Sequence, residues 1–118
     1  MYVDEFDADV VRKVVEFASC SICPMSAFLG GIVAQEVVKF TGKYSPLKQW
    51  LHYDCFEALP DKNVDRTPMG SRYDDSIKIF GRETQEKLFN VNTFMVGSGA
   101  LGCELIKAFA LMGVGCGP

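Results

Sequence analysis

The sequence predicts an α/β fold, and three adjoining features near the end of the chain support that prediction. Residues 92–96 form a short apolar run, which is typical of a strand buried on both faces of a parallel sheet. The glycine-rich stretch GSGALG, residues 97–102, follows directly. Apolar residues at helical spacing then extend over residues 100–112. A strand, a glycine turn and a helix in this order build the first unit of a Rossmann-like sheet.

The spacing of the glycines predicts a loop that binds the phosphates of a nucleotide. In this arrangement Gly97 makes a tight turn, Gly99 lets the backbone approach a phosphate, and Gly102 lets the helix pack closely. The free N–H groups of the first helical turn, at the positive end of the helix dipole, then attract an anion. Because the pattern also recurs by chance, a plain packing role remains the alternative, and for Gly102 alone packing is the preferred interpretation.

Composition and charge restrict the class of protein. The chain has 118 residues with 48% hydrophobic content, which suits a small globular core. Its net charge of -3 is spread along the chain without a run of Lys or Arg, which argues against nucleic acid or a membrane surface as a partner. There is no apolar stretch of about 20 residues, and the acidic residues after Met1 are unlike a signal peptide. We therefore expect a cytoplasmic and nuclear protein.

The remainder of the chain is predicted to be mostly helical. One helix is expected over residues 9–18, capped by Asp7, and a longer one from about Pro24 to Gly42. Glycines inside the longer helix predict close approach of another backbone. A strand is expected at residues 49–53, with Trp50 and Tyr53 in the core. A polar connector over residues 57–71 leads to two short helical pieces separated by a glycine. The glycines inside the longer helix are Gly30 and Gly31. The two helical pieces are residues 72–80 and 82–89, and Gly81 separates them.

The five cysteines are best explained as reduced thiols. Cys20 and Cys23 form a C-x-x-C pair, and His52 and Cys55 offer the other half of a conceivable zinc site. A single pair is common by chance, so packing at a corner between helices is the preferred interpretation and no metal ligand is assigned. Cys103 is expected on the buried side of the last helix and Cys116 in the final glycine turn, neither as a nucleophile.

Five separate motifs together resemble ubiquitin-activating enzyme, in the order and spacing of that family and over nearly the whole chain. They are PMSAFLGGIVAQEVVK from Pro24, SPLKQWL from Ser45, RYD from Arg72, QEKL from Gln85 and VGSGALGCELIK from Val96. In that family one chain carries an inactive and an active ThiF-type adenylation half, which pack as a pseudo-dimer. The resemblance implies that residues 1–60 end the inactive half, 61–71 form a linker, and 72–118 begin the active half.

The resemblance also implies a chemistry. The family uses ATP and Mg²⁺ to adenylate the C-terminus of ubiquitin, transfers it to a cysteine as a thioester, and then works with ubiquitin-conjugating enzymes. Gly97, Gly99, Ala100 and Gly102 would form the nucleotide-contacting loop. Arg72 matches an arginine that reaches across the dimer to ATP, although here a structural salt bridge is expected.

None of the five cysteines matches the thioester cysteine, and the family's metal and adenylate residues lie beyond residue 118. No catalytic residue is therefore assigned in this chain, and the chain alone is expected to be inactive.

Two other classes of function stay open at this point. A nicotinamide-dependent oxidoreductase would hold the ribose with an acidic residue about 20 positions after the glycines, and the sequence ends before that position. A non-catalytic interaction module would use the glycine-containing helix and the corner cysteines for packing or zinc binding.

Overall fold

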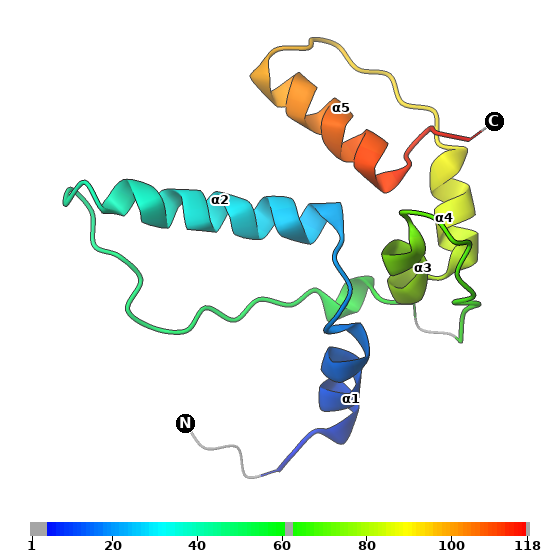
Figure 1. The fold of residues 1–118 in the computed structure, drawn as a ribbon, viewed down its shortest axis with the longest axis horizontal. Coiled ribbons are helices and arrows are strands. Elements are labelled where there is room, and N and C mark those ends of the chain that lie inside the picture. Colours follow the sequence, from blue (N-terminus) through cyan, green and yellow to red (C-terminus); the bar gives the residue numbers. More distant parts are fainter. Residues whose placement is uncertain (1–4, 61–62, 118) are drawn as a thin grey trace.

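The regular structure of the chain is helical. The computed structural model describes residues 5–60 and 63–117, so residues 2–4 of the acidic segment after Met1 and the first two residues of the expected linker lie outside the described residues. The elements in chain order are α1 (Ala8–Phe17), α2 (Cys23–Lys39), the short 3-10 helix η1 (Phe56–Ala58), α3 (Asp74–Phe80), α4 (Arg82–Phe89) and α5 (Ala100–Met112) (Figure 1).

Both predicted strands are wrong for this chain. Residues 49–53 and 92–96 have no regular structure, and no strand occurs anywhere in the described ranges. Figure 1 shows both segments as irregular connections. A strand exists only where its backbone groups pair with a neighbouring strand, and neither segment has such a neighbour. The α/β class is consequently not confirmed by the structure, although the helix predicted to follow the glycines is.

Helix α1 begins where its cap predicts. The Asp7 carboxylate accepts hydrogen bonds from the backbone N–H groups of Asp9 (3.0 Å) and Val10 (3.1 Å). These bonds satisfy two of the donors that a helix start leaves free. The valines of α1 are nevertheless exposed.

Helix α2 matches the prediction closely, with Pro24 in its first turn and Gly42, at φ +79°, just beyond its end. The chain then runs back along α2 towards η1 (Figure 1). An aromatic pair and a hydrogen bond help to join this returning segment to the helix. The rings of Phe28 and Tyr53 are tilted by 34° with centroids 4.3 Å apart, and Glu36 Oε2 accepts a hydrogen bond from Leu47 N–H at 2.9 Å.

The expected close approach at the glycines of α2 is not seen in this chain. A Cβ added at Gly30 or Gly31 would meet no atom within 4 Å in the described structure. Neither glycine has a packing reason here, even though each is unfavourable by about 1 kcal/mol relative to alanine inside a helix.

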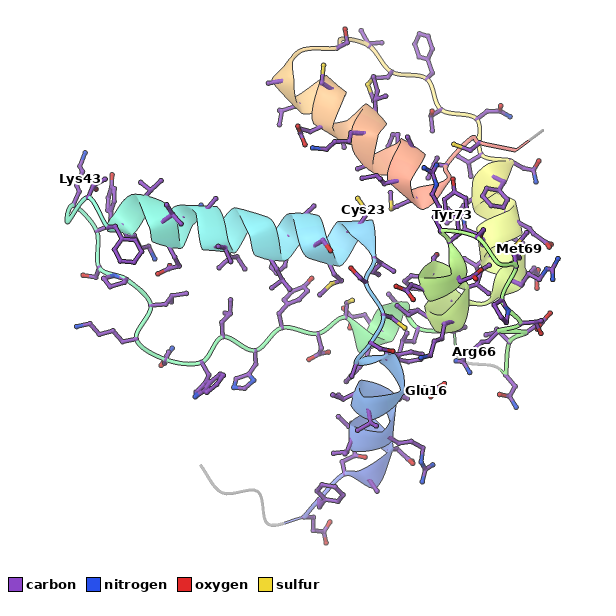
Figure 2. All side chains as sticks on the ribbon, in the orientation of Figure 1. Glu16, Cys23, Lys43, Arg66, Met69 and Tyr73 are labelled. Carbon is purple, nitrogen blue, oxygen red and sulfur yellow. The ribbon has the colours of Figure 1, made fainter. Side chains whose placement is uncertain are left out.

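The small core lies in the α3–α4 pair. Ile77 is completely buried, and Gly81, at φ +88°, turns the chain between the two helices. A Cβ at Gly81 would lie 2.8 Å from the Cβ of Val64, because the connector packs tightly over this turn. The connector also reaches α1, where Arg66 lies 3.8 Å from Glu16 (Figure 2).

The chain is open and leaves much apolar surface uncovered. Its radius of gyration is 17.7 Å, whereas a compact domain of this length would measure about 13.5 Å. Trp50 is 87% exposed and Tyr53 51% exposed, so the prediction that they are core residues is wrong. Figure 2 shows side chains projecting from both sides of α2. A helix that is apolar all round is normally buried, so the exposed apolar surface of α2 is typical of a helix that packs against further protein.

Among the described residues, no helix combines the length and the apolar character needed to cross a membrane.

Candidate functional site

The glycine loop forms the start of α5. Gly97 has φ +93°, a backbone conformation that favours glycine, and Gly99 is the N-cap residue in an extended conformation. No side chain caps the helix at this end. The first-turn N–H groups therefore lie at the positive end of the helix dipole, in the geometry that suits a phosphate.

The glycines of the loop differ in what surrounds them. A Cβ added at Gly97 or Gly99 would meet no atom within 4 Å, so the surface over them is open to a ligand. A Cβ added at Gly102 would lie only 2.5 Å from the carbonyl oxygen of Gly97. The third glycine thus has a packing reason within the chain itself. Ala100 begins the helix directly after the N-cap.

The opposite end of α5 is held by α4 and by Arg72, which precedes α3. Gly113 closes the helix in the left-handed conformation, with Val114 N–H donating to Phe109 O at 2.9 Å, which forms a Schellman motif. Gln85 is completely buried, and its Nε2 donates to Met112 O at 2.9 Å. The sequence pointed to Gln85 only as the start of the QEKL motif, and its buried contact with α5 was not predicted. The available signal was its position three and four residues before Leu88 and Phe89, on the apolar side of α4.

Arg72 has a different role from the one predicted. Its Nη2 donates to Ala110 O at 2.9 Å and to the hydroxyl of Tyr73 at 2.6 Å. The guanidinium carbon lies 4.9 Å from the centre of the Tyr73 ring. Within the described part of the chain Arg72 forms no salt bridge, so the expected salt bridge is not seen there. A cation at the negative end of a helix is instead favoured by the helix dipole, and this places Arg72 on the C-terminal end of α5.

The cysteines are all free thiols. Cys20 and Cys23 are half-buried at the corner between α1 and α2, as a packing role requires. Burial raises the pKa of the Cys20 thiol, against an opposing effect of Lys78. Cys103 is exposed, contrary to expectation, and its Sγ donates to Ser98 O at 3.2 Å. In the described part of the chain this side chain stays open to solvent.

Within the described ranges, no group of three His, Cys, Asp or Glu side chains lies close enough together to hold a metal ion. His52 and Cys55 therefore do not complete a site with the C-x-x-C pair here.

The second half of the chain matches a known protein family. Residues 73–116, which contain α3, α4, the glycine loop and α5, match the ThiF family.

Similarity to particular proteins extends over almost the whole chain. The sequence is 44% identical to ubiquitin-like modifier-activating enzyme 1 of Rattus norvegicus over 97% of its length. It is 46% identical over 96% to ubiquitin-activating enzyme E1 1 of Schizosaccharomyces pombe, and 47% identical over 98% to ubiquitin-activating enzyme E1 1 of Arabidopsis thaliana. The resemblance to ubiquitin-activating enzymes is thereby confirmed. The chain spans only 11–12% of the length of these relatives.

Proposed function

We propose that this chain is a segment of an ATP-dependent ubiquitin-activating enzyme, and that its glycine loop holds phosphates of ATP while the ubiquitin C-terminus is adenylated. The observation that carries the proposal is the glycine loop itself, which joins a free helix N-terminus to two glycines with open space above them. The names of the relatives support ubiquitin as the modifier.

The residues present fit a phosphate group. Gly97 and Gly99 leave room for close approach, and the uncapped first turn offers N–H donors from Ala100 onwards. The chain's own contribution to the reaction is to bind and orient the phosphates through backbone N–H groups. These groups stabilise negative charge without any proton transfer. The ligands of Mg²⁺, the adenine pocket and the thioester cysteine would be supplied by other parts of the enzyme.

The proposed organisation follows from the same resemblance. Residues 1–60 would end the inactive adenylation half, 61–71 would be the linker, and 72–118 would begin the active half with a Rossmann-like sheet. The exposed apolar sides of α2 would then be covered where the two halves pack as a pseudo-dimer. We further propose ubiquitin-conjugating enzymes as downstream partners, and a cytoplasmic and nuclear location.

Residues 92–96 would become a strand only when a neighbouring strand is present. Phe94 is 93% exposed in this chain, as expected for a strand residue whose covering layers are missing. The helix of the loop forms without that sheet because its hydrogen bonds are internal.

The decisive experiment is an ATP–pyrophosphate exchange assay on a full-length enzyme that carries this sequence. Exchange that requires both ubiquitin and magnesium supports the proposal. Binding of NAD(H) without ubiquitin-dependent exchange would instead support an oxidoreductase. The same assay on the 118-residue chain should give no exchange and no thiol-sensitive ubiquitin adduct, because a nucleotide cleft needs a second parallel strand beside the loop.

A further inference from the structure

Helix α5 is anchored at the end opposite to the glycine loop. Gln85 Nε2 and Arg72 Nη2 each donate to a carbonyl oxygen of its last turn, at 2.9 Å in both cases. Two more bonds fix the chain just after the helix. They run from Gly115 N–H to Leu88 O and from Gly117 N–H to Phe89 O, both at 2.9 Å. The loop end has no comparable support in the described structure, where Leu101 is 82% exposed.

Gln85 is the buried member of this anchor. Around it, Tyr73 and Phe89 meet edge to face with ring centroids 5.1 Å apart. A Cβ at Gly113 would lie 2.7 Å from Phe89 and 2.9 Å from Gln85 Nε2, so the helix end is pressed directly against the amide. Gln85 Oε1 is buried without a hydrogen-bond partner in the described chain. An amide oxygen that is buried without a partner costs free energy. We therefore attribute the presence of glutamine here to its Nε2 donor, which binds Met112 O.

We propose that Gln85 is a positioning residue for the phosphate loop: by holding the C-terminal end of α5 against α4, it sets the direction of the helix and hence the place of Gly97–Gly102. This inference rests on the proposed function. Helix α5 has 13 residues and is roughly 20 Å long, so a rotation at one end displaces the other end in proportion to this length. A tilt of roughly 5° at the anchor moves the loop by roughly 2 Å over that length. Misplacement of about 1 Å is enough to impair a reaction strongly.

The test compares Gln85→Met with Lys87→Met in a full-length enzyme that carries this sequence. Methionine keeps the length of glutamine and removes the donor. Lys87 lies on the same helix, and its side chain is 74% exposed in an ion pair with Glu83, so it is the matched control. Gln85→Met should raise KM for ATP in the exchange assay by about tenfold, with KM for ubiquitin unchanged. Lys87→Met should leave both values at the wild-type level.

Hydrogen exchange measured on the same proteins gives a second readout. In Gln85→Met the hydrogen-bonded amides of residues 103–106, of which Cys103 N–H donates to Gly99 O, should exchange faster, although they lie at the far end of α5. If that variant does not accumulate, Gln85→Leu takes its place, because leucine suits the aromatic surroundings and also lacks the donor.

Each result has one meaning. A lower melting temperature with unchanged KM for ATP and unchanged exchange at residues 103–106 would show a purely structural role and overturn the proposal. Wild-type enzyme without ubiquitin-dependent pyrophosphate exchange would overturn the proposed function instead. The hydrogen-exchange comparison would still decide whether Gln85 controls the loop.

Discussion

Gly102→Ala should disturb the glycine loop although alanine is the better helix former. In a helix interior alanine is favoured over glycine by about 1 kcal/mol. The new Cβ would lie 2.5 Å from Gly97 O, whereas carbon and oxygen normally stay about 3.3 Å apart. A backbone oxygen cannot rotate away, so the loop has to shift, and overpacking of this kind costs roughly 1–3 kcal/mol. The net effect is a loss of roughly 0–2 kcal/mol in local stability at the start of α5.

Native-state hydrogen exchange on the 118-residue chain measures this local stability directly. The matched control is Gly30→Ala, which lies inside α2 with no atom within 4 Å of its Cβ. It should protect the amides of α2 by about 1 kcal/mol. The hydrogen-bonded amides of residues 103–106 should lose protection in Gly102→Ala. A gain of protection there as large as that in the control would refute the packing argument for Gly102.

Three further changes test other contacts. Gly113→Ala should lower the free energy of unfolding by about 2 kcal/mol or more, because φ is +80° and the new Cβ would lie 2.7 Å from the Phe89 ring. Urea denaturation measures the loss. Hydrogen bonding from Lys39 and Leu47 lowers the pKa of Glu36, so its stabilisation is present above pH 4.5 and is lost as the pH falls through the lower folded value. Glu36→Gln should therefore flatten acid unfolding below about pH 4.5, and an unchanged acid profile would contradict this. Replacing Cys20 and Cys23 with serine should cost about 1–2 kcal/mol without reducing bound zinc, as metal analysis of the purified proteins would show.

The helices could be predicted from sequence because their signals are local. Asp7 caps α1, Pro24 lies in the first turn of α2 and Gly113 ends α5, and each acts within a few residues of itself. Glu83 and Lys87 lie four residues apart on α4, and their ion pair, at 2.7 Å, is local in the same way.

The errors concern features that depend on distant parts of the protein. Residues 92–96 carry a correct apolar pattern, yet a strand needs a partner that this chain does not provide. Trp50 was expected in the core on its hydrophobicity alone, but burial depends on what packs against it. The site was only half predictable. The loop glycines could be identified from their spacing, whereas the anchoring roles of Arg72 and Gln85 arise from contacts 38 and 27 residues away in sequence.

The central claim is that the glycine loop holds ATP phosphates, and Gly99→Val in a full-length enzyme carrying this sequence tests it most directly. The chain itself does not obstruct a side chain at this position, since no atom lies within 4 Å of the Cβ and the backbone is extended. Folding should therefore be nearly unaffected, while the branched side chain fills the space that a phosphate needs. We predict a folded enzyme, shown by circular dichroism, that has lost ubiquitin-dependent ATP–pyrophosphate exchange. Exchange at the wild-type rate in the folded variant would contradict the assignment of the phosphate loop.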